Sequence, residues 1–218
     1  MRKIPYILLF AFSSLIVYSQ EMPTDSLSID AVVNACISMR DAVAKNDYAA
    51  IKQSAYALRT TRTTSFSSLL CIDDSIASLK GHLVFDETFA DSLTEGKDVY
   101  SKADDIYRTR THRGQYTDGK VHTKTCLVKA GKSTKYTFRS KGLQELAIVA
   151  EAGGLVTMKI RVTNSAGLDK RFDDTKNVKK GMPQRKASFE LPIDRSNLVE
   201  LEIINCGIKD CSFVVISN

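Results

Sequence analysis

The chain has 218 residues, a formal net charge of +6 and 43% hydrophobic residues. That length suffices for one large domain or two small ones with apolar cores. The chain has no tryptophan and three histidines. It therefore lacks the usual sugar-stacking side chain, although tyrosines can replace it, and it has few imidazoles for catalysis or metal binding.

The first segment, residues 1–19, has the layout of a secretory signal peptide. Arg2 and Lys3 precede a mostly apolar run, and small residues precede a cleavage point ahead of Gln20. We expect an exported protein, periplasmic or extracellular. The apolar run is shorter than the ~20 residues of a membrane-spanning helix. No later stretch is apolar enough to span a bilayer, so the mature chain is predicted to have no membrane span. A retained anchor helix is the alternative interpretation.

Residues 20–112 are predicted to be mainly helical. From Ser28 to about Arg62, apolar residues recur at steps of three and four, which is typical of amphipathic helices. Asn46 and Asp47 interrupt the pattern, and Asp47 suits the N-cap of a second helix. We therefore expect an antiparallel helical hairpin. Its expected apolar positions are Ile29, Val32, Val33, Cys36, Ile37 and Val43, then Tyr48, Ile51, Ala55 and Leu58.

Residues 113–218 are predicted to form a β-sandwich domain. The stretch Thr111 to Lys120 has the composition of a linker, and beyond it apolar and polar residues alternate, as in VTMKIRVTN. Seven or eight short strands with intervening turns indicate an antiparallel β-sandwich or jelly roll. The expected fold class is therefore α+β, with a helical N-terminal region before an antiparallel sandwich.

The charge of the chain changes at the same boundary. Residues 20–112 carry a net charge of −4, and residues 113–218 carry +8. Such asymmetry is compatible with a surface for anionic partners, with electrostatic attraction between the halves, or with solvated lysine-rich strand faces.

The order of elements beyond residue 120 resembles that of the prokaryotic pre-peptidase C-terminal β-sandwich modules. Ala130-Gly131 precedes a strand with Tyr136 and Phe138, and the segment closes on the apolar runs 199–203 and 213–216. The acidic strand of that family is replaced here by VTMKIRVTN, so no calcium role carries over. The whole chain also looks like small exported proteins of the Bacteroidetes type. The resemblance implies an accessory or ligand-binding module and no catalyst.

No constellation of residues that is typical of an enzyme is visible. The chain has no Gly-x-Ser-x-Gly elbow, no histidine pair at zinc spacing and no phosphate-binding glycine loop. We therefore expect no metal, no cofactor and no catalytic residue. A hydrolase site built between the two halves from distant residues remains the alternative, with candidates Asp73, Asp104 and His82.

The basic run NVKKGMPQRK is the one predicted ligand-binding element. Its clustered charges, Lys179, Lys180, Arg185 and Lys186, are placed to attract an anionic polymer. No aromatic residue is interleaved, so specific binding of single-stranded nucleic acid is not expected. A solvated loop is the alternative interpretation.

Export makes disulfides the expected state of the five cysteines. Four residues separate Cys206 from Cys211 between two apolar runs, so we expect these cysteines to be paired across a final hairpin. Cys36 and Cys71 are the candidates for a second pair, which leaves Cys126 unpaired.

These observations favour an exported, non-enzymatic binding or accessory protein of the cell envelope or extracellular space. In this hypothesis the sandwich domain contacts an anionic envelope polymer or another envelope protein. The unpaired cysteine leaves a covalently linked envelope assembly as a further alternative, so the oligomeric state stays open.

Overall fold

The computed structural model describes residues 29–60, 63–72, 78–85, 121–173, 184–193 and 196–218. In this part of the chain two helices precede ten strands. None of the helices described is both long and apolar enough to cross a membrane. The predicted signal peptide and the predicted linker, residues 111–120, lie outside the described residues.

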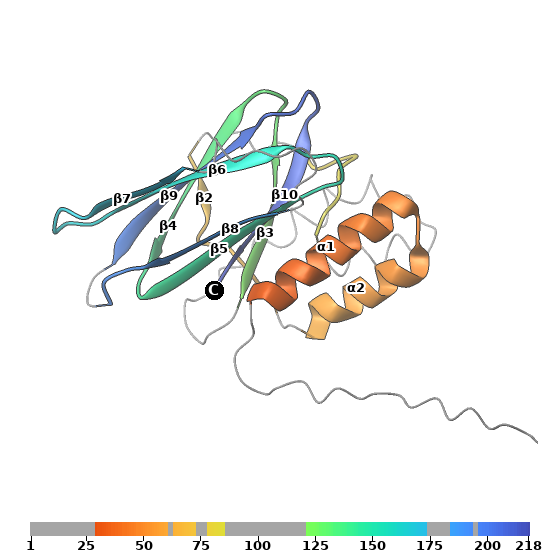
Figure 1. Ribbon diagram of the computed structural model, residues 1–218, viewed down its shortest axis with the longest axis horizontal. Coiled ribbons are helices and arrows are strands. Elements are labelled where there is room, and N and C mark those ends of the chain that lie inside the picture. Colours follow the sequence, from red (N-terminus) through yellow and green to blue (C-terminus); the bar gives the residue numbers. More distant parts are fainter. Residues whose placement is uncertain (1–28, 61–62, 73–77, 86–120, 174–183, 194–195) are drawn as a thin grey trace, which may run out of the picture.

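The helices α1 (Ile29–Lys45) and α2 (Tyr48–Thr60) form the predicted antiparallel hairpin (Figure 1). Asn46 ends α1 in the left-handed conformation, with φ 55°, which asparagine tolerates better than most residues. The carboxylate of Asp47 accepts a hydrogen bond from the backbone N–H of Ala50 at 3.1 Å. Asp47 is therefore the N-cap of α2, as the sequence predicts.

The strands form two five-stranded sheets, with the orders β1-β3-β10-β5-β8 and β2-β4-β9-β6-β7. All neighbours pair antiparallel except β1 and β3, which are parallel. We call these sheet A and sheet B. The strands are β1 (Thr64–Ser65), β2 (Leu70–Cys71), β3 (His122–Val128), β4 (Ser133–Ser140), β5 (Leu143–Ala150), β6 (Val156–Thr163), β7 (Asp169–Asp173), β8 (Gln184–Glu190), β9 (Asn197–Asn205) and β10 (Cys211–Ser217).

The two sheets pack face to face, and the helical hairpin covers the other face of sheet A (Figure 1). Successive strand residues point to opposite faces. On β10, therefore, Phe213 and Val215 contact the sandwich core while Val214 and Ile216 contact the helices. Each of these four side chains is fully buried and contributes about 2 kcal/mol by area. A helical hairpin and an antiparallel sandwich are thus confirmed, whereas the jelly-roll assignment stays a prediction.

The segment between the helices and β3 adds one short strand to each sheet. Thr64 pairs with His122 in sheet A, and Cys71 pairs with Tyr136 in sheet B. The four residues between β1 and β2 cross from one sheet to the other and bury Phe66 and Leu69 in the sandwich core. The sequence predicts only a polar break over most of this stretch, because its two apolar side chains are separated by serines.

The predicted final hairpin is wrong. Strand β9 pairs with β4 and β6 in sheet B, whereas β10 pairs with β3 and β5 in sheet A. The residues between them cross from sheet to sheet, so Cys206 and Cys211 do not face each other on one ladder. Cys206 is exposed and Cys211 is buried, and both are free thiols.

The predicted pairing of Cys36 with Cys71 is also absent. Cys36 lies in the core between α1 and sheet A, while Cys71 packs against the sandwich core. Sheet A separates the two cores, so the side chains of Cys36 and Cys71 lie on opposite sides of that sheet. Tyr48 is a further correction, because it is 57% exposed at the start of α2 and does not join the apolar stripe.

Candidate functional site

The predicted basic loop is divided by the structure. Lys179 and Lys180 lie outside the described residues. Arg185 and Lys186 belong to strand β8, where neighbouring side chains point to opposite faces. Arg185 pairs in register with Ile148 and is 8% exposed, while Lys186 pairs with Ala147 on the helix-covered face.

Lys186 fastens the helical hairpin to sheet A. Its ammonium group lies 2.9 Å from Asp30 Oδ1 on α1 and 3.7 Å from Glu145 Oε2 on β5. The hydrogen bond to Asp30 and the charges of both carboxylates raise the pKa of Lys186, against a smaller opposing effect of burial. The ammonium group of Lys186 is therefore engaged by Asp30 and Glu145, and these two carboxylates largely neutralise its charge.

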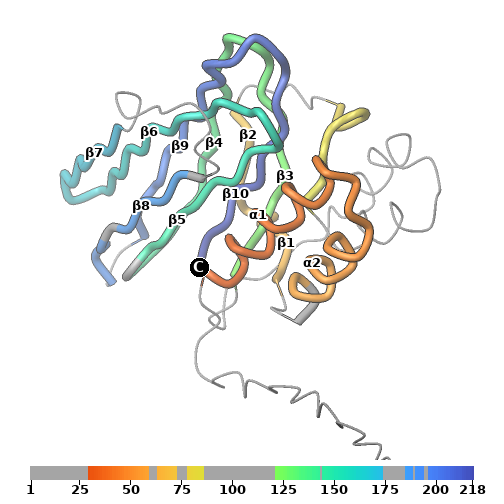
Figure 2. Tube along the Cα trace, turned by 45° about the vertical axis from the view of Figure 1, so that its right-hand side comes forward, coloured from red at the N-terminus to blue at the C-terminus, as the bar shows by residue number. Residues whose placement is uncertain are grey.

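A second basic cluster lies where strands β3, β4, β9 and β10 turn, at the end of the sandwich opposite the C-terminus (Figure 2). The turn between β3 and β4 spans residues 129–132, and the connection between β9 and β10 spans residues 206–210. The backbone N–H of Ala130 donates to Asp210 Oδ1 at 2.9 Å, which holds the two connections side by side. We call this region the loop end.

Side-chain hydrogen bonds fix the conformation of the loop end. Asn205 Nδ2 donates to the carbonyl of Lys209 at 2.8 Å, and Asn205 Oδ1 accepts from the N–H of Gly207 at 2.8 Å. The N–H of Cys206 donates to Leu155 O at 2.8 Å, which adds the β5–β6 connection. Asn205 is itself buried, so its hydrogen bonds fix the connection between β9 and β10 from the protein interior. Binding a ligand would therefore cost this connection little conformational entropy.

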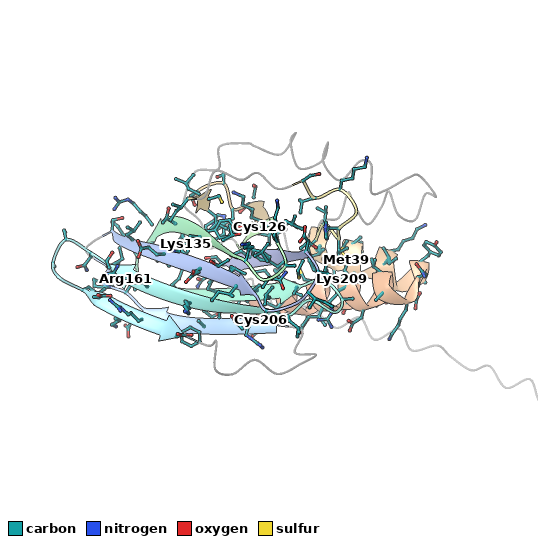
Figure 3. The ribbon with its side chains drawn as sticks, turned by 90° about the horizontal axis from the view of Figure 1, so that it is seen from above. Met39, Cys126, Lys135, Arg161, Cys206 and Lys209 are labelled. Atoms are coloured by element: carbon teal, nitrogen blue, oxygen red, sulfur yellow. The ribbon has the colours of Figure 1, made fainter. Side chains whose placement is uncertain are left out.

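The loop end presents three lysines, Lys129, Lys132 and Lys209, all exposed. Among the described residues, none of their ammonium groups makes an ion pair or a hydrogen bond. Ile208 beside them is 94% exposed. Figure 3 views the molecule from this end and labels Cys206 and Lys209. Asp210 supplies one negative charge, so the loop end keeps an excess of positive charge around an apolar tip.

The outer face of sheet B is charged in a different way, because its basic groups have acidic neighbours. Arg161 lies 3.2 Å from Asp169 and 3.7 Å from Glu200, and Lys159 lies 4.0 Å from Asp173. Hydrogen bonds from Arg161 and Arg171 lower the pKa of Asp169 to about 2. The charges of Lys159 and Arg161 are thus balanced by neighbouring carboxylates, whereas those of the loop-end lysines are not.

His82, the one candidate of the hydrolase hypothesis that is described, contacts Glu151 on the β5–β6 connection. His82 Nδ1 lies 3.0 Å from Glu151 Oε1. The same carboxylate accepts hydrogen bonds from the backbone N–H groups of Leu83, at 3.3 Å, and Ser212, at 2.9 Å. Asp73 and Asp104 lie outside the described residues. The arrangement fastens residues 79–85 to sheet A.

The nucleophiles beside this carboxylate are not activated. The hydroxyl of Ser212 is buried and donates to Leu83 O at 2.8 Å, away from the imidazole. Burial and the charge of Glu151 raise the pKa of the Cys211 thiol to about 12, so it is protonated at neutral pH. The described residues also contain no group of three or more metal-binding side chains.

Sequence reasoning missed the loop end because its lysines are far apart in the chain. A turn signal accompanies each of them, with Gly131 between Lys129 and Lys132 and Gly207 two residues before Lys209. Only the order of the strands in the two sheets brings these turns together. A run such as Lys179-Lys180 is visible in the sequence, whereas a cluster assembled by topology is not.

Comparisons with known proteins give little guidance. No protein-family model matches the chain, and a search of curated proteins finds no match. Among solved structures, a Yersinia pseudotuberculosis-derived mitogen is similar at 12% identity and TM-score 0.32, over 45% of this chain and 84% of that one. Such a TM-score is too low to support an assignment of fold or function.

Two further solved structures are similar at the same level. TmCBM61, in complex with β-1,4-galactotriose, matches with 8% identity and TM-score 0.30, over 45% of this chain and 81% of that one. The Salmonella Typhimurium protein PliG, a periplasmic inhibitor of g-type lysozyme, matches with 15% identity and TM-score 0.29, over 48% and 93%. The assignment of a β-sandwich is therefore based on the strand pairing within this chain and not on these similarities.

Proposed function

We propose that this chain is an exported, non-enzymatic binding protein whose loop end contacts an anionic polymer of the cell envelope. The observation that carries the proposal is the set of three unpaired lysines on connections fixed by internal hydrogen bonds. An unpaired ammonium group has no internal partner to lose when it binds an anion. Clustered, unneutralised positive charge also accelerates encounter with a polyanion.

The scaffold supports a binding role for this end of the molecule. Helices α1 and α2 cover the outer face of sheet A, and on the outer face of sheet B Lys159 and Arg161 are engaged in ion pairs. The loop end is the described surface where exposed, unpaired lysines from different connections meet an exposed apolar residue, Ile208. Rigid loops that join the strands of a sandwich are a common location for ligand contacts.

Export is the part of the proposal that rests on the sequence. We expect the full chain, expressed in a bacterial host, to be recovered from the periplasm or medium with Gln20 as its first residue. N-terminal sequencing of the fractionated protein measures this. A chain that keeps Met1 and stays in the cytosolic or membrane fraction contradicts export.

Binding is tested by replacing Lys129, Lys132 and Lys209 together with glutamine and measuring retention on immobilised heparin, a soluble anionic polysaccharide. Each lost phosphate- or sulfate-type contact lowers the salt needed for elution. We expect the triple variant to elute at clearly lower salt than the unchanged protein. The matched control replaces three exposed lysines elsewhere, Lys45, Lys52 and Lys141.

The control removes the same total charge, so equal retention losses in the two variants would show that net charge alone drives binding and would contradict the proposal. A third variant, with Lys179 and Lys180 replaced by glutamine, tests the basic run found in the sequence. If that variant alone loses retention, the binding surface is the predicted run and not the loop end.

A further inference from the structure

Two cysteines lie at the edge of the sandwich where the chain crosses from sheet A to sheet B. Cys71 on β2 pairs in register with Tyr136 on β4, and Cys126 on β3 pairs in register with Phe213 on β10. Residues directly opposite each other on a ladder point to the same face. Tyr136 and Phe213 are both in the sandwich core, so both sulfurs point into the space between the sheets.

Tyr136 connects these two register pairs across the sandwich. Its ring centroid lies 6.2 Å from that of Phe213, at an interplanar angle of 77°, and its side chain hydrogen-bonds to Cys126. Cys71 is the next residue beyond Tyr136 toward the edge of sheet B. Cys126 is the next residue beyond Phe213 toward the same edge of sheet A. The strand order and register therefore give the two cysteines corresponding positions in the facing sheets.

The chain itself holds the two sheets close together at this edge. Only residues 66–69 separate β1 of sheet A from β2 of sheet B. Lys124, on the same face of β3 as Cys126, donates to Leu69 O in this crossing at 2.7 Å. A crossing of four residues limits the separation of the sheet edges that it joins.

The electrostatic environment of Cys126 also includes Cys71. Burial raises the pKa of Cys126 to about 11, while Lys124 and the hydrogen bond with Tyr136 oppose this effect. Cys71 is a further neighbour that raises the pKa of Cys126. Cys71 is the one thiol that contributes to this shift, so it lies within electrostatic range of Cys126.

We propose that Cys71 and Cys126 form a disulfide that joins the two sheets at this edge of the sandwich. Inter-sheet disulfides close other β-sandwiches in the same manner. This pair replaces the pairings expected from the sequence, because topology separates Cys36 from Cys71 and moves Cys206 out of register with Cys211. Cys36, Cys206 and Cys211 stay reduced.

The oxidant is a disulfide compound, such as glutathione disulfide or a protein thiol oxidase. The partly exposed Cys71, as its thiolate, attacks one sulfur of the oxidant and releases the other as a thiolate. The Cys126 sulfur then loses its proton, attacks the Cys71 sulfur and displaces the remaining oxidant thiolate. Two cysteine thiols are oxidised to one disulfide, and the oxidant is reduced to two thiols, which take up the two protons.

The test uses the reduced full chain with Cys206→Ser, which removes the exposed thiol and so prevents links between chains. After incubation with glutathione disulfide, the protein is digested without reduction and mapped by mass spectrometry. We expect one linked pair of peptides, containing Cys71 and Cys126, lighter by two hydrogens than the separate thiol peptides. Adding Cys71→Ser abolishes the link, whereas adding Cys36→Ser leaves it intact.

A second readout detects the link without digestion. Oxidation is expected to raise the midpoint of thermal unfolding in the Cys206→Ser protein and to leave it unchanged once Cys71→Ser is added. A stable glutathione adduct on Cys71, a link between other cysteines, or four thiols that all remain alkylatable after unfolding would each overturn the proposal. The first of these outcomes would show that Cys126 lies out of reach of Cys71.

Discussion

His82 Nδ1 lies 3.0 Å from Glu151 Oε1, and this contact joins residues 69 positions apart in the sequence. Glu151 follows strand β5, whereas His82 belongs to a segment that packs beside the helical hairpin. The carboxylate also accepts hydrogen bonds from the backbone N–H groups of Leu83 and Ser212. One side chain thus holds the 79–85 segment against two strands of sheet A.

Replacing Glu151 with alanine is expected to lower the free energy of unfolding by about 3 kcal/mol. Two partly buried backbone N–H groups and one imidazole nitrogen lose their acceptor, and each unsatisfied donor costs about 1–3 kcal/mol. Urea unfolding followed by circular dichroism measures the change. The control is Glu190→Ala, at an exposed position on the edge strand β8, which we expect to change stability by no more than about 0.5 kcal/mol. A loss of that small size for Glu151→Ala would contradict the anchoring role.

The sequence predicts those parts of this fold that depend on local pattern. The helical hairpin follows from apolar periodicity and the Asn46-Asp47 break. Strand β6 follows from the alternation of Val156, Met158, Ile160 and Val162, all of which are buried. The exposure of Tyr48 was not predicted, because a large apolar ring at the first position of a helix fits the periodic pattern without being covered.

The pairing of strands is not local, and it is where sequence reasoning failed. The runs around Ile148 and Phe213 are continuously apolar, a sign that both faces of their strands are covered. That sign marks sheet A as the middle layer, but it does not say which strands are neighbours. A five-residue connection joins strands of one sheet or of two sheets equally well, so a hairpin was expected where β9 and β10 cross between sheets.

The candidate sites show the same difference between features that are local in the sequence and features that depend on the tertiary fold. Lys179 and Lys180 are adjacent in the chain and were visible as a cluster. Lys129 and Lys209 are far apart in the chain and are brought together by tertiary hydrogen bonds such as the one between Ala130 and Asp210. His82 was singled out from the sequence, yet its partner Glu151 was not. No spacing rule connects residues 69 positions apart.

Replacing Asp47 with alanine is expected to destabilise the protein by about 1 kcal/mol, because the N–H of Ala50 loses the cap acceptor at the start of α2. Asp47→Asn is the matched control, since asparagine caps helices about as well as aspartate. The comparison of the two variants by thermal unfolding separates capping from charge. Equal losses in both would show that the charge of Asp47, and not its hydrogen bond, stabilises α2.

The carboxyl group of Asp169 is expected to titrate at a pKa of about 2, against an ordinary value of 3.8. Hydrogen bonds from Arg161 and Arg171 favour its charged form in the folded state. The folded pKa lies below the unfolded one, so this contribution to stability is complete above about pH 4 and is lost as the pH falls toward 2. Carboxyl carbon chemical shifts measured by NMR over that range test the assignment.

The control for this titration is a variant with Arg161 and Arg171 both replaced by glutamine. Without the two guanidinium groups, the pKa of Asp169 is expected to return toward 3.8. An unchanged titration in the double variant would show that other groups hold the carboxylate in its charged form. Because Asp169 is exposed, we expect added salt to raise the pKa of Asp169 in the unchanged protein.

Gly154 is packed so closely against Cys211 that alanine at this position is expected to destabilise the protein. A Cβ atom there would overlap Cys211 Sγ and lie 3.0 Å from Ala150 Cβ. Overpacking of this kind costs about 1–3 kcal/mol. In a Cys211→Ala background the overlapping sulfur is gone, so the cost of Gly154→Ala should fall by about 1 kcal/mol or more.

The neighbouring Gly153→Ala variant is the control for this double-mutant cycle. Gly153 has φ 81° and open space around its Cα, so alanine there is strained by the backbone conformation alone. Removing the sulfur of Cys211 should therefore leave the cost of Gly153→Ala unchanged. If Cys211→Ala reduced both costs equally, or neither, the sulfur of Cys211 would not be the atom that requires glycine at position 154. The two results together measure how firmly this thiol is packed, and firm packing keeps Cys211 out of disulfide exchange.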